Sequence, residues 1–139
     1  MIKRKILIVE DEVISSMSLK LLLELWGYET YEASSGKDAI KILRNGKIDL
    51  ALMDINIKGD RDGIEVAKQI RLRFHTPSIF ITGYSDKEML EKAEMAKPIG
   101  IFIKPLNFDR LKLTIDSFFH ETRENEKKLI IRKSKKSNM

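Results

Sequence analysis

Short apolar runs alternate with segments of helical periodicity five times along the chain, and this alternation restricts the possible folds more than any other feature. Residues 5–9 (KILIV), 48–53 (IDLALM), 78–82 (SIFIT) and 99–103 (IGIFI) are dominated by apolar side chains, many of them β-branched. Runs of this kind are typical of strands that are buried on both faces. Residues 28–33 (YETYEA) alternate between polar and apolar, which predicts a more exposed strand.

A helix is predicted after each strand, because apolar residues recur there three and four positions apart. The first helix ends before Gly27, and the second is capped by Ser34 or Ser35 and ends at Asn45–Gly46. The predicted apolar faces, in chain order, are Val13, Ile14, Met17, Leu21, Leu22 and Leu25; Ala39, Ile40 and Leu43; Ile64, Ala67, Ile70 and Phe74; Met89, Leu90 and Ala93; and Phe108, Leu111, Ile115, Phe118 and Phe119.

The resulting order is (βα)₅, and it predicts an α/β fold with a parallel sheet covered by helices on both faces. We expect an open, doubly wound, flavodoxin-like sheet with the strand order 2-1-3-4-5. In that order the functional crevice lies outside the carboxyl ends of the strands, between the first and the third.

Composition adds several expectations. A chain of 139 residues is long enough for one domain, which we place at residues 1–122. The absence of cysteine excludes disulfides, thiolate zinc sites and thiol catalysis, and suits a reducing cytoplasm. No apolar run approaches the ~20 residues of a membrane span, and the N-terminus MIKRKILIVEDE lacks the apolar core of a signal peptide. A cytoplasmic protein without a membrane partner is therefore expected.

The formal net charge of +5 belongs mostly to the C-terminal end. Residues 121–139 hold seven Lys and Arg and three Glu, which gives +4 there and leaves +1 for residues 1–120. We therefore expect residues 123–139 to form a basic, flexible tail, and we regard nucleic-acid binding by this chain alone as disfavoured. Two alternatives stay open: a nucleic-acid-binding tail, and a linker to an output domain.

Polar residues stand where the predicted strands end. Glu10 and Asp11 follow the first strand, Asp54 follows the third, Thr82 and Gly83 the fourth, and Lys104 and Pro105 the fifth. Each position has an ordinary explanation, since acidic residues favour helix starts and a lone Lys is usually solvated. Together they gather carboxylates, a hydroxyl and an ammonium at one edge of the sheet.

Such a cluster of carboxylates calls for a cation, because two anions ~4 Å apart repel by about 4 kcal/mol at an effective dielectric of ~20. Oxygen ligands without His or Cys favour Mg²⁺, held by Asp11, Asp54 and the backbone carbonyl of Asn56. A carboxylate beside Mg²⁺ suits attack on phosphorus, which would make Asp54 an aspartyl phosphate. Thr82 and Lys104 would donate to the phosphoryl oxygens. Gly83 would leave space for the group.

The segments ILIVEDE, LALMDINIKGDRDGIEVAKQIR, IFITGYSD and GIFIKPL resemble the receiver domain of two-component response regulators, over residues 5–119. The resemblance implies that Asp54 is the phosphoacceptor, that Glu10 and Asp11 form the acidic pocket, with Asp11 on Mg²⁺ and Glu10 in its outer shell, and that Thr82 is the switch hydroxyl. It also implies that Lys104 pairs with the phosphate and precedes Pro105 through a cis bond.

The same resemblance implies partners. A sensor histidine kinase or a phosphotransfer protein would supply the phosphoryl group, and an output protein would bind the fourth helix, fifth strand and fifth helix. The chain would act as a signalling switch and not as a turnover enzyme, as a monomer or a weak homodimer.

One position departs from the family pattern. Members commonly carry Tyr or Phe three residues before the Lys that corresponds to Lys104. This chain has Ile101 there and Phe102 one place later. Strand alternation sends these two side chains to opposite faces. We therefore expect Phe102 in the core, and a weaker coupling between Thr82 and an aromatic ring.

Two other classes are disfavoured by single residues. A haloacid-dehalogenase-type phosphatase also forms an aspartyl phosphate, but it carries a second Asp two residues later as acid/base, where this chain has Asn56. A flavin or nucleotide carrier needs Gly and hydroxyl groups after the first strand. Glu10 and Asp11 at that place would repel phosphate without a metal.

Overall fold

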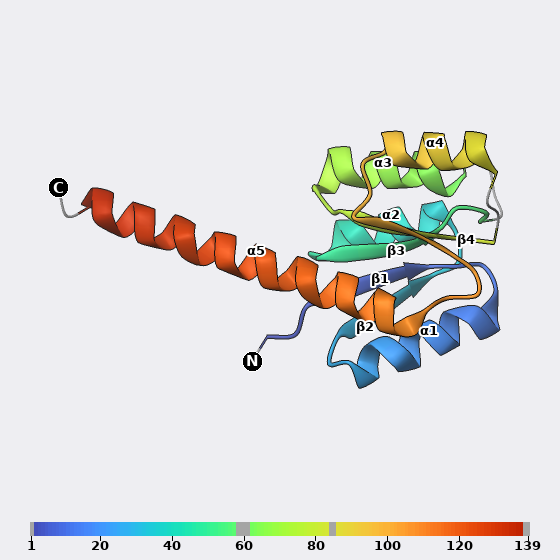
Figure 1. Ribbon diagram of the computed structural model, residues 1–139, viewed down its shortest axis with the longest axis horizontal. Helices are drawn as coiled ribbons and strands as arrows, with labels where there is room; N and C mark the ends of the chain where they lie inside the picture. Colours follow the sequence, from blue (N-terminus) through green and yellow to red (C-terminus); the bar gives the residue numbers. More distant parts are fainter. Residues whose placement is uncertain (1, 58–61, 84–85, 138–139) are drawn as a thin grey trace. The chain divides into compact units, whose positions relative to one another are not determined.

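The computed structural model describes residues 2–57, 62–83 and 86–137, so part of the Gly- and Asp-rich loop after Asp54 lies outside the described residues. Five strands pair in parallel in the order β2-β1-β3-β4-β5, which confirms the predicted fold class (Figure 1). They are β1 (Lys5–Val9), β2 (Glu29–Ala33), β3 (Leu50–Asp54), β4 (Ser78–Thr82) and β5 (Gly100–Ile103).

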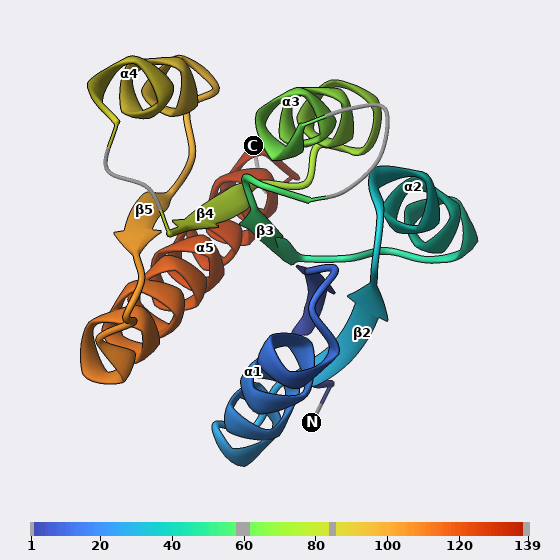
Figure 2. The same ribbon diagram turned by 90° about the vertical axis from the view of Figure 1, so that its right-hand side faces the viewer.

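Five helices alternate with the strands: α1 (Val13–Leu25), α2 (Gly36–Asn45), α3 (Gly63–Phe74), α4 (Lys87–Met95) and α5 (Phe108–Ser137). The chain divides into two compact units, Met1–Leu106 and Asn107–Met139. Within the first unit, α1 covers one face of the sheet, and α2, α3 and α4 lie on the opposite face (Figure 2). Nearly all residues of the central strands β1, β3 and β4 are buried, which agrees with their continuous apolar sequences.

Side-chain caps fix where three helices begin. The Ser35 side chain accepts a hydrogen bond from the backbone N–H of Asp38 at 3.2 Å, as predicted for α2. The Asp62 carboxylate accepts from Glu65 at the start of α3, and the Asp86 carboxylate accepts at the start of α4. Each cap satisfies a backbone donor that the first helical turn leaves unpaired.

The predicted apolar face of α1 is wrong. The buried residues of this helix are Ser16, Leu19 and Leu23, which follow one another at helical spacing. The residues predicted to be buried are largely exposed instead: Val13, Ile14, Met17, Leu21 and Leu25. The helix is apolar around much of its circumference, so its periodicity did not indicate which side contacts the sheet.

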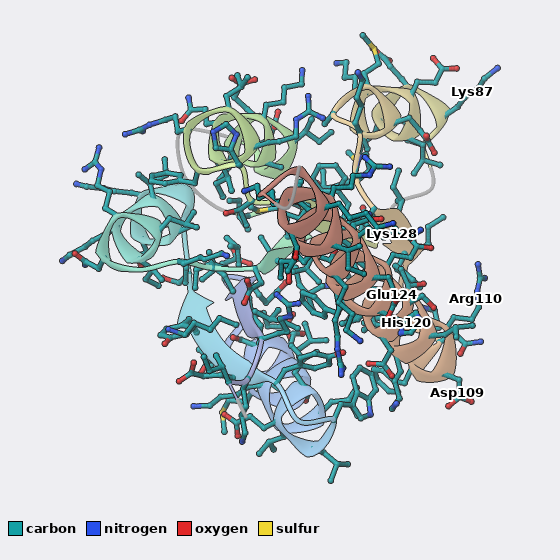
Figure 3. All side chains as sticks on the ribbon, turned by 90° about the vertical axis from the view of Figure 1, so that its left-hand side faces the viewer. Lys87, Asp109, Arg110, His120, Glu124 and Lys128 are labelled. Carbon is teal, nitrogen blue, oxygen red and sulfur yellow. The ribbon has the colours of Figure 1, made fainter. Side chains whose placement is uncertain are left out.

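The helix α5 forms the second unit and is 30 residues long. Of its predicted apolar face, Leu111, Ile115 and Phe119 are buried, and Phe108 is half exposed. Figure 3 shows His120, Glu124 and Lys128 following one another along one side of the helix, as residues four positions apart do. The helix continues through the boundary predicted after residue 122, and the flexibility of residues 123–139 stays a prediction. No helix in the described residues has the length and apolar character needed to cross a bilayer.

Candidate functional site

The strand register brings the polar strand ends to one edge of the sheet. Val9 pairs with Met53, so Glu10 comes level with Asp54 on the neighbouring strand. Asp54 in turn pairs with Ile81, and Thr82 pairs with Ile103, which places Lys104 one residue beyond. The predicted site residues thus come from four different segments and meet because the strands are parallel.

Three carboxylates converge at this edge. Glu10 and Asp54 are 5% and 7% exposed, and Asp11 is half buried. One carboxylate oxygen from each of the three residues lies within 4.8 Å of the other two. Among the described residues, these three side chains form the cluster that could hold a metal ion. Ligands made only of oxygen suit a hard cation such as Mg²⁺, because it prefers carboxylates, carbonyls and water.

Lys104 is the cation that faces these carboxylates. Its Nζ lies 3.5 Å from Asp54 Oδ2 and 3.9 Å from Glu10 Oε2. Its backbone N–H donates to the carbonyl oxygen of Thr82 at 2.8 Å, which fixes the chain beyond β5 against the end of β4. The peptide bond between Lys104 and Pro105 is cis.

The pKa of Glu10 reflects this crowding. Burial, a hydrogen bond with Asp54 and the charge of Asp54 raise the pKa of Glu10 to about 8, although the nearby ammonium of Lys104 lowers it. Burial is the largest cause, and the charge of Asp54 adds to it more than the ammonium of Lys104 offsets. A divalent cation bound between the carboxylates would act in the same direction as Lys104 and offset the charge of Asp54, which agrees with the fit of Mg²⁺ to these oxygen ligands.

Asn56 makes two hydrogen bonds within the site that were not predicted from the sequence. Its backbone N–H donates to Asp54 Oδ1 at 2.9 Å, a turn closed by the Asp side chain two residues earlier. Its side-chain amide donates to Thr82 Oγ1 at 3.4 Å, a contact that sequence analysis missed. The spacing Asp-x-Asn signals the first contact, but the second depends on the tertiary structure. The predicted use of the Asn56 carbonyl as a metal ligand stays a proposal.

Thr82 is fully buried at the end of β4. Its hydroxyl donates to the sulfur of Met89 on α4, with Oγ1 and Sδ 4.0 Å apart. Apart from the two chain neighbours of Gly83, no heavy atom of the described residues lies within 4 Å of a Cβ placed at this glycine.

Gly63, at the first position of α3, is a further residue that sequence analysis left without a role. A Cβ here would overlap the backbone carbonyl oxygen of Asp54 and lie 2.8 Å from the Cα of Ile55. The Gly63 N–H also donates to the carbonyl oxygen of Ile55 at 2.9 Å. Glycine therefore lets α3 begin directly against the backbone of Asp54.

Ile101 and Phe102 lie on β5, and the burial of Phe102 differs from the prediction. Ile101 is partly buried and packs against the main apolar cluster. Phe102, expected in the core, is only partly buried and is not among the core residues. The correction follows from position, because β5 is the edge strand of the sheet and its side chains are less enclosed than those of β3 and β4.

Comparison with known proteins agrees with this geometry. The family model described as the response regulator receiver domain matches residues 6–116. Among curated proteins, the chain is 37% identical over 123 residues to the transcriptional regulatory protein ZraR of Salmonella typhimurium, covering 88% of this chain and 28% of that protein. It is 32% identical over 124 residues to the transcriptional regulatory protein PdtaR of Mycobacterium tuberculosis, covering 88% of this chain and 60% of that protein.

A solved structure gives the same result. The CheY-like response regulator receiver domain protein of Methanospirillum hungatei superposes with a TM-score of 0.81 at 29% identity, covering 89% of this chain and 99% of that chain. This chain therefore corresponds to nearly all of that receiver domain, whereas it spans 28% of ZraR and 60% of PdtaR.

Proposed function

The chain belongs to the family of response regulator receiver domains of two-component systems, and from this premise we propose that Asp54 accepts a phosphoryl group in a Mg²⁺-dependent reaction. The donor is the phospho-histidine of a sensor histidine kinase or of a phosphotransfer protein. The modified domain then acts as a switch for a protein partner.

The two different environments of the Asp54 carboxylate oxygens carry this proposal. Oδ1 accepts the backbone N–H of Asn56 at 2.9 Å, which fixes the orientation of the carboxylate. Oδ2 faces the Lys104 ammonium at 3.5 Å. A carboxylate held in this way is positioned for in-line attack, in which an oxygen of Asp54 forms a bond to phosphorus. The bond from phosphorus to the donor nitrogen breaks, and the imidazole leaves with that electron pair.

The residues that would hold the metal are Asp11, Asp54 and the backbone carbonyl of Asn56, with Glu10 in the outer shell. A Mg²⁺ ion held there would supply positive charge that offsets the carboxylates and the negative charge of the transferred phosphoryl group. Ionisation of Glu10 is part of assembling the site, because its pKa of about 8 keeps it largely protonated at neutral pH without the metal.

Thr82 and Lys104 are the proposed donors to the phosphoryl oxygens. The Lys104 ammonium already lies beside the attacking carboxylate, and phosphorylation would give it an anionic partner with several strong acceptor oxygens. The Thr82 hydroxyl would change its hydrogen-bond partner when Asp54 is phosphorylated. The side chain of Thr82 is buried and contacts α4, so this change would reach that helix.

The output is proposed to be a protein that binds α4, β5 and α5. The chain would work as a switch in the cytoplasm, as a monomer or a weak homodimer, and not as a turnover enzyme. The names of ZraR and PdtaR connect those two proteins to transcription, and this chain would reach such an output through a partner or a further domain.

Intact mass spectrometry tests the chemistry. With Mg²⁺ and acetyl phosphate, the protein is expected to gain one phosphoryl group, and excess EDTA should prevent the gain. Asp54→Asn should abolish labelling, because an amide is not a nucleophile. Asp11→Asn should raise the Mg²⁺ concentration needed, whereas Thr82→Ala and Lys104→Ala should still be labelled but show a smaller conformational response. Labelling that persists in Asp54→Asn or in EDTA would contradict the mechanism.

A further inference from the structure

Met89 is the residue of α4 that contacts the proposed switch hydroxyl. It is the third residue of the helix, and it packs against the main cluster of buried apolar side chains. It also lines a hollow of about 250 Å³ together with Asn56 and Ile64. The Thr82 hydroxyl donates to its sulfur, with 4.0 Å between Oγ1 and Sδ.

A continuous series of contacts connects Asp54 with this helix. The backbone of Asn56 donates to the Asp54 carboxylate at 2.9 Å, and its side-chain amide donates to Thr82 Oγ1 at 3.4 Å. Thr82 then donates to Met89. The hydroxyl of Thr82 therefore lies between the carboxylate that is proposed to react and the helix α4.

The Thr82 hydroxyl has one hydrogen, so it cannot donate to Met89 and to a phosphoryl oxygen on Asp54 at the same time. A thioether sulfur is a weak acceptor, whereas a phosphoryl oxygen is anionic and a strong one. Once Asp54 carries the group, the hydroxyl is expected to turn away from the sulfur. The polar contact between Thr82 on β4 and Met89 on α4 is then lost, and Met89 is unbranched and flexible enough to repack.

We propose that Met89 is a positioning residue that holds the Thr82 hydroxyl in the unphosphorylated protein and couples phosphorylation of Asp54 to α4. This inference rests on the proposed function. The inference also explains how the switch could work with Ile101 in place of an aromatic residue. The coupling would run from Thr82 to a side chain of α4 and would need no aromatic ring at position 101 of β5.

The test compares Met89→Leu with Met95→Leu in the labelling reaction with acetyl phosphate and Mg²⁺. Leu keeps the volume of the side chain but removes the sulfur acceptor. The Thr82 hydroxyl then lacks the sulfur acceptor that competes with a phosphoryl oxygen, so the conformation that holds the phosphoryl group is expected to be more populated. Met89→Leu should label about twofold to fivefold faster than wild type, given the modest net strength of one hydrogen bond. Met95→Leu, on the exposed side of the same helix, should match wild type.

A double-mutant cycle separates coupling from packing. In a Thr82→Val background the hydroxyl is absent, so Met89→Leu should cause no further change in labelling rate. An effect of Met89→Leu that persists in this background would overturn the inference, and so would equal rates for Met89→Leu and Met95→Leu.

A second test observes the methionine methyl groups of the wild-type protein by NMR. With ¹³C-methyl methionine, the Met89 methyl signal should shift on labelling, while the Met95 signal stays in place. A labelled protein with an unmoved Met89 signal would contradict the inference and leave the proposed function intact. Failure of wild-type protein to label at Asp54 would instead overturn the proposed function, and the inference with it.

Discussion

The side chain of Glu10 lies buried between a carboxylate and an ammonium, and its ionisation depends on both. Burial and Asp54 raise the pKa of Glu10 from 4.5 to about 8, against the opposing effect of Lys104. Without a metal, the folded protein therefore keeps a proton at Glu10 through most of the neutral range. The unfolded chain loses that proton near pH 4.5.

This difference predicts how stability changes with pH. Between pH ~4.5 and ~8 the folded state binds more protons than the unfolded state, so the contribution of Glu10 to stability falls as pH rises. Urea unfolding in EDTA from pH 5 to 9 should show this decline in wild type, and Glu10→Gln should remove it. Added Mg²⁺ should stabilise wild type more at pH 8.5 than at pH 6. Equal pH slopes for wild type and Glu10→Gln would contradict the raised pKa.

At the scale of elements, the junction between β3 and α3 positions the carboxylate of Asp54, which is proposed to react. Gly63→Ala should displace the end of β3, because the new methyl group would meet the backbone of Asp54 and Ile55. A displacement approaching ~1 Å is expected to slow labelling of Asp54 by roughly tenfold to a hundredfold.

Gly46→Ala is the matched control for Gly63→Ala. Apart from its two chain neighbours, a Cβ at Gly46 would meet no heavy atom of the described residues within 4 Å, and the φ of Gly46, 177°, is an extended conformation open to any residue. Its labelling rate should equal that of wild type. If Gly63→Ala labelled equally fast, the close approach of α3 to Asp54 would have no functional importance.

The helix α1 offers a direct test of which apolar residues stabilise the fold. Leu23 is fully buried, whereas Leu21 is 65% exposed. Leu23→Ala should lower the free energy of unfolding by about 2–5 kcal/mol, because it leaves a cavity. Leu21→Ala should change it by less than about 0.5 kcal/mol. Denaturant unfolding measures the change in the free energy of unfolding for both variants. A larger loss for Leu21→Ala than for Leu23→Ala would indicate that the face predicted from periodicity is the buried one.

At the scale of the whole molecule, positive charge is concentrated in residues 121–139. Leu129, Ile130 and Ile131 of this segment are exposed. Deletion of residues 124–139 should leave folding and labelling of Asp54 intact, and should change nucleic-acid binding only at low salt, where counterion release dominates. Circular dichroism, mass spectrometry and a salt series of binding measurements check this. Sequence-selective DNA binding at physiological salt, lost on truncation, would show that the tail binds nucleic acid.

The sequence by itself determined the order of strands and helices, the parallel sheet and the set of polar residues at the strand ends. These features depend on local periodicity and on one general property of parallel sheets, that the carboxyl ends of the strands meet at one edge. The sequence alone therefore predicts that Glu10, Asp54, Thr82 and Lys104 lie together at this edge.

Only the tertiary structure decided which face of α1 is buried, that Gly63 lies against the backbone of Asp54, and that Thr82 contacts both Asn56 and Met89. It also decided the raised pKa of Glu10, which needs burial beside Asp54 and Lys104. In each case the partner lies elsewhere in the chain, on another strand, helix or loop. Burial and contact depend on how the elements pack, and a helix with apolar residues around much of its circumference carries no local signal for the side that meets the sheet.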